Sequence, residues 1–242
     1  MRLDNGWEAS AAAWIADQGE HGDFGRRYVL DPVMLPRALA HAPKRALDVG
    51  CGEGRFCRML RQHGIATTGV DPTPSLIATA RARDPEGVYV EGRGESLPFS
   101  ETSFDLVASY LSLIDIPDYQ RAIVEMARVL APGGKLLIAN LNSFNTAGDG
   151  SSELGWARNA HGDKLSFRFD RYLDPRAYWI ENRGIRVRNH HRPLSAYMDA
   201  LLGSGLQLNF FDEPTPVAGA PEPKASNYRR APHFLVMEWV KP

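Results

Sequence analysis

The sequence predicts an α/β fold in which a parallel, doubly wound sheet is covered by helices on both faces. Two observations carry this prediction. Between residues 44 and 141, short apolar runs alternate with segments of helical periodicity, which is typical of βαβ units. A glycine-rich turn from Gly50 to Gly54 directly follows the first apolar run. A chain of 242 residues is long enough for one such core with additional segments.

The core elements follow from these periodicities. Strands are predicted at 46–49, 66–70, 88–90, 104–109 and 135–141. Helices are predicted at 54–63, after Thr73, and at 118–130. Gly64 ends the first helix, Pro74 suits the first turn of the second, and the Pro-Gly-Gly run at 132–134 ends the third.

The flanking segments are patterned differently. We expect a helical cap before the sheet, with helices at 7–15 and 33–39, and a loop or lid at 142–164. A pair of added strands is expected around 165–170 and 185–191, followed by a helix at 193–202 and two last strands at 206–211 and 233–240. The expected organisation is a cap (1–43), a cofactor-binding core (44–141), a lid or substrate insertion (142–193) and a segment that completes the sheet (194–242).

Composition limits the partners and the compartment. A net charge of −1 gives no overall attraction to nucleic acid or to a membrane surface, and no apolar stretch approaches the roughly 20 residues of a membrane span. The cysteines, Cys51 and Cys57, match neither a zinc pair nor a disulfide framework, and no metal site is predicted. We therefore expect a cytoplasmic protein in a reducing compartment, monomeric or weakly dimeric.

The glycine turn narrows the class of ligand. A dinucleotide fingerprint needs a third glycine where this chain has Arg55. Asp48 and Glu53 place two carboxylates where a pyrophosphate would have to lie, which disfavours a phosphate-bearing ligand. The same carboxylates suit a ligand with a cationic amino group, and S-adenosylmethionine has such a group and no phosphate.

Asp71 ends the second predicted strand, 17 residues beyond Gly54. A carboxylate at that position can accept hydrogen bonds from both hydroxyl groups of a ribose. The alternative interpretation is that Asp71 only opens an Asp-Pro turn with Pro72. Its combination with the glycine turn in one βαβ unit favours the ribose role.

Five linked motifs resemble those of class I S-adenosylmethionine-dependent methyltransferases of the UbiE/type 11 kind. They are LDVGCGEG at 47–54, VD at 70–71, GRGESLPF at 92–99, FDLV at 104–107 and RVLAPGG at 128–134. The resemblance implies a Rossmann-like seven-stranded sheet with an antiparallel last strand. It also implies S-adenosylmethionine as cofactor and S-adenosylhomocysteine as product. The cofactor-binding residues that it implies are Asp48, Gly50, Cys51, Gly52, Gly54, Asp71, Pro72, Gly94, Glu95, Ser96 and Tyr110. Arg93 stands where the family commonly has an acid near adenine. Either Glu95 takes the place of this acid, or backbone groups alone contact the edge of adenine.

The acceptor side is less defined. The predicted function is methyl transfer to an O, N or C atom of a small organic acceptor, with Tyr28, His191 and Trp179 as candidate acceptor contacts. Where the acceptor needs a base, His190 and His191 are the candidates, since imidazole titrates near neutral pH. The strand at 104–109 is not followed by the base-flipping motif of nucleic-acid methyltransferases, so nucleic acid is not expected as substrate. Two alternatives are an inactive protein that binds S-adenosylmethionine or S-adenosylhomocysteine, and an NAD(P)-dependent oxidoreductase on a related fold.

Overall fold

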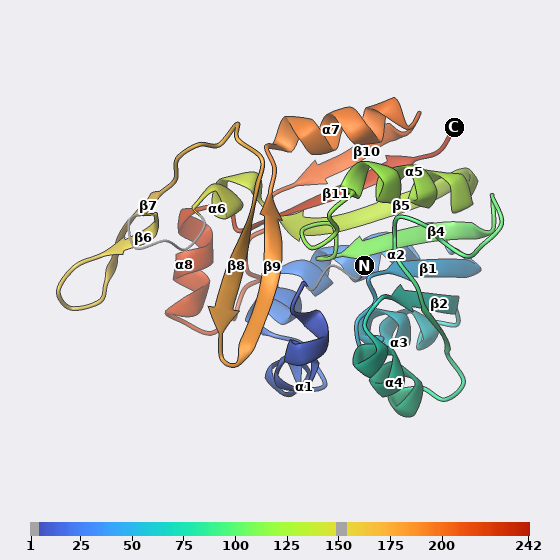
Figure 1. Cartoon of the computed structure of the whole chain (residues 1–242), viewed down its shortest axis with the longest axis horizontal. Helices are drawn as coiled ribbons and strands as arrows, with labels where there is room; N and C mark the ends of the chain where they lie inside the picture. The colour runs from blue at the N-terminus through green and yellow to red at the C-terminus, as the bar shows by residue number, and fades with distance from the viewer. Residues whose placement is uncertain (1–4, 149–153) are drawn as a thin grey trace.

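The computed structural model describes residues 5–148 and 154–242. A seven-stranded sheet lies at its centre, with the strand order β10-β11-β5-β4-β1-β2-β3 (Figure 1). The strands are β1 (Arg45–Val49), β2 (Ala66–Asp71), β3 (Val88–Glu91), β4 (Phe104–Tyr110), β5 (Leu130–Leu141), β10 (Gln207–Asp212) and β11 (Phe234–Val240). Strand β11 is antiparallel to both of its neighbours, and β1 to β5 pair in parallel. The predicted doubly wound, Rossmann-like sheet with an antiparallel last strand is confirmed.

Helices cover both faces of this sheet (Figure 1). The helices are α1 (Trp7–Gln18), the π-helix η1 (Arg26–Leu30), α2 (Asp31–Leu39), α3 (Arg55–Arg61), α4 (Pro74–Arg83), α5 (Tyr119–Val129), α6 (Ser143–Ala147), α7 (Leu194–Gly203) and α8 (Lys224–Arg230). Side chains of α5 and α7 share one hydrophobic core, and side chains of η1, α2 and α3 share the core on the opposite face. Burial on both faces explains why the central strands are apolar runs rather than alternating ones.

Strand β1 shows how the two cores divide its side chains. Leu47 and Val49 belong to the core of α5 and α7, whereas Ala46 belongs to the core of α2 and α3. Successive side chains of a strand point to opposite faces. Asp48 comes between Leu47 and Val49 near the carboxyl end of the strand, and it is buried as they are.

Four further strands form two antiparallel hairpins outside the main sheet. They are β6 (Gly155–Arg158) with β7 (Lys164–Arg168), and β8 (Arg176–Asn182) with β9 (Ile185–His191). The sequence predicted one pair of strands here, so β6 and β8 are additions, and so are α6 and α8. Asn159 explains the first hairpin, because its side-chain oxygen accepts hydrogen bonds from the backbone N–H groups of His161 and Asp163 and closes the turn.

The N-terminal segment is helical, as predicted, and it contacts the second hairpin. Ser10 of α1 donates its hydroxyl hydrogen to the carbonyl of Arg186 in β9 (3.0 Å) and accepts from the N–H of the same residue (2.9 Å). Gly6 approaches so closely that a Cβ there would lie 2.0 Å from the Arg186 carbonyl oxygen, and its φ is +82°. Only glycine fits this junction. The cap and the insertion therefore meet on one side of the sheet.

Candidate functional site: a cavity at the carboxyl ends of the strands

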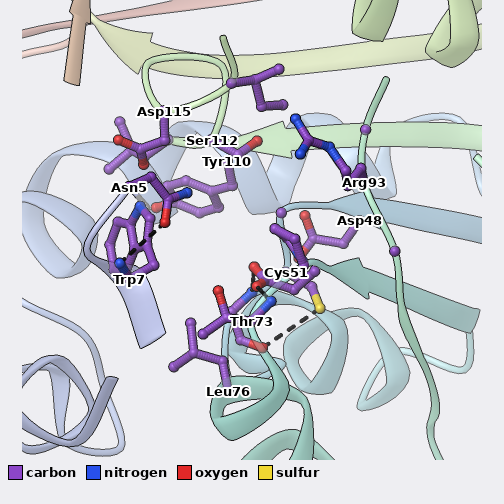
Figure 2. A pocket seen from close by; sticks show the side chains of 18 of the residues that line it. Asn5, Trp7, Asp48, Cys51, Thr73, Leu76, Arg93, Tyr110, Ser112 and Asp115 are labelled. Carbon is purple, nitrogen blue, oxygen red and sulfur yellow. Dashed lines mark hydrogen bonds between the residues drawn. The ribbon is translucent and has the colours of Figure 1, made fainter. Parts of the chain in front are cut away.

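A cavity of about 510 Å³ opens where β1, β2, β3 and β4 end. Its volume lies in the range of about 300–1,000 Å³ that is usual for small-molecule sites. Figure 2 shows Asp48, Cys51 and Arg93 on one side of it, and Asn5, Trp7 and Asp115 on the other. Open α/β sheets bind their ligands at this edge, because the loops that connect strand to helix meet there.

The glycine turn forms one wall of the cavity. Gly50 has φ +78°, and a Cβ there would lie 2.3 Å from the Cβ of Ser112, so a larger residue is excluded. Ser112 in turn donates its hydroxyl hydrogen to the carbonyl of Val49 at 2.6 Å. The turn after β1 is thus packed directly against the loop after β4, which brings Cys51 and Gly52 to the cavity as well.

Asp71 ends β2 beside this turn and is buried. One carboxylate oxygen accepts from the N–H of Gly52 (3.0 Å) and the other accepts from the N–H of Thr73 (2.9 Å). Burial raises the pKa of Asp71, and these backbone hydrogen bonds oppose the increase. The side chain therefore makes the Asx-type turn that the sequence offered as an alternative, and it also lines the cavity next to Pro72.

Asp48 is the acid of the site with the fewest hydrogen-bond partners for its carboxylate oxygens. Its Oδ2 is 3.8 Å from the Cys57 thiol, whereas its Oδ1 is buried and has no hydrogen-bond partner among the described residues. Burial, and then the charge of Asp71, raise the pKa of Asp48 to about 7. A buried carboxylate is costly unless it is paired. An ammonium group bound in the cavity would supply the missing partner.

Glu53 does not share this role, which corrects the expectation of two carboxylates facing the ligand. Its side chain is fully buried outside the cavity lining, and Oε2 accepts from Arg58 (2.6 Å) and from Arg83 (2.7 Å). The guanidinium groups of α3 and α4 draw the carboxylate away from the cavity. The spacing of a turn does not determine to which side each of its side chains points.

The loop after β3 supplies another wall. Gly94 and Glu95 line the cavity, and Arg93, which stands where the resemblance expects an acid, forms an ion pair with Glu95 (2.7 Å). Glu91 also lines this wall. Ser96 is exposed and lies outside the lining, since its N–H closes a turn onto the carbonyl of Arg93.

Gly54 also lies outside the lining. It precedes α3 and packs over the ring of Tyr89, where a Cβ would come within 2.7 Å of ring atoms. The structure therefore gives Gly54 a packing role, whereas Gly50 and Gly52 reach the cavity.

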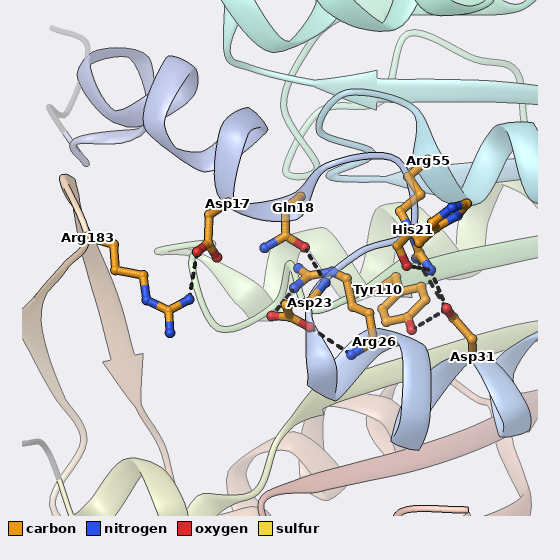
Figure 3. Close-up of polar contacts among 9 residues, drawn as sticks. All are labelled: Asp17, Gln18, His21, Asp23, Arg26, Asp31, Arg55, Tyr110 and Arg183. Atoms are coloured by element: carbon orange, nitrogen blue, oxygen red, sulfur yellow. Dashed lines mark hydrogen bonds and ion pairs between the residues drawn. The ribbon is translucent and has the colours of Figure 1, made fainter. Parts of the chain in front are cut away.

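Tyr110, at the end of β4, lines the cavity and joins it to the N-terminal cap. Its hydroxyl donates to Asp31 at 2.8 Å, and Asp31 also forms an ion pair with Arg55 (Figure 3). Burial, and then the nearby Asp31 carboxylate, raise the pKa of Tyr110 far above its ordinary value. The phenol therefore stays neutral and acts as a wall of the cavity that also anchors η1 and α2.

The candidate acceptor contacts and bases lie away from the cavity lining. Tyr28 stacks against Phe24, and Trp179 lies against Arg186. His191 is fully buried with Nδ1 2.7 Å from the Thr146 hydroxyl, and its Nε2 is 2.8 Å from a backbone carbonyl. Neither ring nitrogen of His191 is available to a ligand.

His190 is likewise absent from the cavity lining, which leaves both predicted imidazole bases outside it. Burial and the charges of Arg192 and Arg188 lower its pKa to about 4. The imidazole is therefore neutral at physiological pH.

Sequence reasoning missed a group of lining residues from outside the core motifs. They are Asn5, Trp7, Glu8, Trp14, Arg26, Arg55, Ser112 and Asp115. Trp7 and Trp14 are seven residues apart on one helix, so the two side chains share a face, and this spacing was the available signal. Asp115 was visible as a single acid in the apolar run at 111–116.

Within residues 5–148 and 154–242, no helix is long and apolar enough to cross a membrane. The same part of the chain holds no cluster of three or more His, Cys, Asp or Glu side chains placed to bind a metal ion.

The fold and the cavity define an α/β protein with a small-molecule site at the carboxyl ends of its parallel strands. Residues 47–138 match a family model described as a methyltransferase domain. The chain is 32% identical over 183 residues to malonyl-[acyl-carrier protein] O-methyltransferase of Enterobacter lignolyticus, covering 75% of this chain and 69% of that protein. The chain therefore belongs to the family of S-adenosylmethionine-dependent methyltransferases.

Two other similarities agree with this family. Demethylmenaquinone methyltransferase of Thermus thermophilus is 38% identical over 107 residues, which cover 42% of this chain and 49% of that protein. The chain thus spans about half the length of that relative. The solved structure of an S-adenosylmethionine-dependent methyltransferase from Mesorhizobium loti superposes with a TM-score of 0.73 and 26% identity, over 92% of this chain and 100% of that one.

Proposed function

We propose that the chain transfers a methyl group from S-adenosylmethionine to a small organic acceptor, with S-adenosylhomocysteine as the other product. The observation that carries the proposal is the pair of acids at the two ends of the glycine turn. Asp48 has a buried oxygen without a partner among residues 5–148 and 154–242, and Asp71 lies 19 residues from Gly52 in the chain but accepts its N–H. An amino group and a ribose diol are ligands that suit these two carboxylates.

The proposed cofactor contacts follow the lining of the cavity. Asp48 holds the amino group, Gly50, Cys51 and Gly52 surround the amino-acid portion, and Asp71 holds the ribose with Pro72 beside it. Gly94 and Glu95 face adenine, and Tyr110 closes the acceptor side. Bound S-adenosylmethionine supplies an electrophilic methyl group, so the protein has to hold an acceptor in line and exclude water. In this proposal, residues 44–141 hold the cofactor, and the cap (1–43) and the insertion (142–193) enclose the acceptor.

The proposed acceptor is a small molecule. The relatives are named for a menaquinone precursor and for a malonyl group on a carrier protein. Both names describe organic acceptor groups, and a cavity of about 510 Å³ leaves limited room beyond the cofactor. Buried, unpaired Cys51 and Cys57 agree with a reducing, cytoplasmic setting, in which we propose a monomer or a weak homodimer.

Calorimetric titration with S-adenosylhomocysteine tests the proposal. Asp71→Ala should weaken binding by about 10–100-fold, because hydrogen bonds to a charged group contribute roughly 1.5–3 kcal/mol. Gly52→Val should weaken it at least as much, since Gly52 has φ +56° and a Cβ there would lie 3.2 Å from the Trp14 ring. Asp199→Asn, an exposed change on α7, is the matched control. Wild-type affinity in both cavity variants would exclude the site.

The same preparation distinguishes the two alternatives. Stronger binding of NADH than of S-adenosylhomocysteine would favour an oxidoreductase. Binding of S-adenosylhomocysteine without product from labelled S-adenosylmethionine, over a panel of acceptors, would favour a protein that binds the cofactor without catalysis.

A further inference from the structure

Asp115 is a carboxyl group of the cavity that lies outside the motifs that account for the cofactor. Asp115 belongs to the loop between β4 and α5, and it lines the cavity next to Trp7 and Asn5 (Figure 2). It is the acid that interrupts an otherwise apolar run at 111–116. Placing a carboxylate in an apolar loop is unfavourable unless contacts compensate for the lost water. The contacts of Asp115 therefore indicate its role.

Two elements remote in sequence hold the Asp115 side chain. Asn189 of β9 donates from Nδ2 to Oδ1 at 2.6 Å, and the side chain of Trp7 in α1 also hydrogen bonds to the carboxyl group. Burial, and then the charge of Asp71, raise the pKa of Asp115 to about 8, whereas Arg26 and the two hydrogen bonds oppose the increase. The group is therefore a stronger proton acceptor than an ordinary carboxylate, yet it is ionised to a useful extent near neutral pH.

The loop that carries Asp115 is held by hydrogen bonds from β9 and from Arg192, the residue that follows it. The N–H of His190 donates to the carbonyl of Ile114 at 2.9 Å. Arg192 is buried and donates to the carbonyls of Leu113 (2.9 Å) and Ile116 (2.6 Å). The Arg192 guanidinium therefore hydrogen bonds to backbone carbonyls of this loop. The His190 imidazole is neutral near pH 8 because its pKa is lowered to about 4. Neither group competes with Asp115 for a proton near pH 8.

Two other acids near the cap side of the cavity have hydrogen-bond partners of their own. Glu8 of α1 accepts from Ser75, and Asp31 holds Tyr110 and Arg55. Among the carboxyl groups that line the cavity on the side of the cap and the insertion, Asp115 is the one whose hydrogen-bond partners are an amide and an indole. These partners orient the group without neutralising it.

We propose that Asp115 accepts the proton of the methyl acceptor, whose attacking atom is a hydroxyl oxygen or an amine nitrogen. This inference rests on the proposed methyltransferase function. The attacking atom forms a bond to the methyl carbon while the bond from that carbon to sulfur breaks, and the electron pair of the broken bond stays on sulfur. The proton of the attacking atom passes to a carboxylate oxygen of Asp115. A carboxylate acceptor has no proton to lose, and its charge opposes that of Asp115. Asn189 is a positioning residue in this scheme.

The first test needs no acceptor. Protein with carbon-13 at the aspartate carboxyl carbons is saturated with S-adenosylhomocysteine and titrated by NMR, with Asp115→Asn identifying the resonance. We expect one carboxyl resonance, absent from the variant, that titrates at or below pH 8 and well above the ordinary range. Asn189→Ala should move this titration to higher pH, since the carboxylate loses a donor. A resonance that titrates near pH 4 would overturn the proposal.

The second test uses catechol and benzylamine, with benzoate as the anionic counterpart, and labelled S-adenosylmethionine at saturation. Saturation keeps Asp48 paired, so its titration does not enter the profile. Catechol and benzylamine themselves titrate above pH 8, so we expect the ionisation of Asp115 to add a separate inflection near pH 8 to the rise of the rate. Asp115→Asn should remove this inflection and lower kcat/KM for the acceptor by about 10²–10⁴-fold, the usual contribution of a general base. Asp199→Asn should leave the profile unchanged.

The outcomes separate this inference from the proposed function. Asp115→Asn that binds S-adenosylhomocysteine within about twofold of wild type, but has lost turnover, supports the role of Asp115 in proton transfer. Methylation of benzoate alone, or a rate that falls as pH rises through 8, overturns it and leaves the methyltransferase function intact. If the wild-type protein does not bind S-adenosylhomocysteine, the proposed methyltransferase function itself is wrong. If none of the three probes is methylated, the carboxyl titration decides.

Discussion

The core at residues 44–141 and the segments appended to it use polar groups for different purposes. In the core, burial leaves Asp48 with an oxygen that has no partner in the described part of the chain, and it raises the pKa of Asp48 to about 7. In the appended segments, the polar side chains that join remote parts of the chain have hydrogen-bond partners. Arg192 donates to backbone carbonyls of the loop after β4, and Ser10 both donates to and accepts from Arg186.

This difference indicates that the core at residues 44–141 provides the ligand contacts, whereas the appended segments are fixed to it by paired polar groups. An acid with an unpartnered oxygen that lines a cavity is a candidate contact for a ligand. Saturated contacts between remote segments instead fix the walls of the cavity. Asp115 combines the two properties, since it faces the cavity and is oriented by Asn189 and Trp7.

The largest expected effect is a difference in the loss of unfolding free energy between a substitution in the sheet and one in the first hairpin. Trp239 of β11 is fully buried, and Trp239→Ala should lower the free energy of unfolding by about 3 kcal/mol, the low end for such truncations. The low end applies because its indole N–H has no partner among the described residues. Trp156→Ala in β6 should cost less than about 1 kcal/mol, since its half-buried ring contacts mainly Phe167 and Lys164. Urea unfolding followed by circular dichroism measures both. Equal losses would show that the hairpin belongs to the same folding unit as the sheet.

The core elements could be predicted because their signals are local. The apolar runs of β1 and β4, the Gly64 stop after α3 and the Asp118 cap of α5 each depend on a few adjacent residues. Strands β6 and β8 were missed because their pairing depends on partners across a turn, and their apolar alternation is weak. Helix α8 was missed because the proline-rich stretch before it dominates the pattern.

The site could be predicted in part for the same reason. Asp48 and Asp71 follow strands of the core, and a residue that ends a parallel strand has a defined place. Glu53 was assigned to the ligand because spacing does not show that Arg58 and Arg83 draw its side chain away. Asp115 could not be placed, since its partner Asn189 is 74 residues away in the sequence.

The pH dependence of stability distinguishes the acids of the cavity from half-buried histidines outside it. Asp48 and Asp115 have pKa values raised to about 7 and about 8, so the stability they contribute is present at low pH and is lost as pH rises through those values. His190 and His233 have pKa values lowered to about 4 by burial, so their contribution is lost as pH falls from 6.5 toward 4. The two effects oppose each other below pH 6.5, and above it only the acids act.

Without a ligand, the free energy of unfolding should therefore fall between pH 6.5 and 8, by about 2 kcal/mol, from about 1.4 kcal/mol per pH unit for a fully coupled group. Asp115→Asn should remove most of this slope, and Asp48→Asn should reduce it only below about pH 7. His233→Gln should change the slope only below pH 6.5. Urea titrations at half-unit pH steps measure each slope. A slope that is the same in wild type and in Asp115→Asn would contradict the raised pKa.

The smallest expected effects lie at the junction of α1 with the β8–β9 hairpin, where an ion pair and a hydroxyl can be compared. Arg183 is 2.7 Å from Asp17, but both groups are at the surface (Figure 3), and Arg183→Ala should leave the melting temperature unchanged in 0.15 M salt. Ser10 is buried, and Ser10→Ala leaves both backbone groups of Arg186 without their partner, at about 1–2 kcal/mol. Hydrogen exchange should show faster opening of α1 in Ser10→Ala alone. Faster opening in Arg183→Ala would mean that charge, rather than close backbone packing at Gly6, attaches the cap to the insertion.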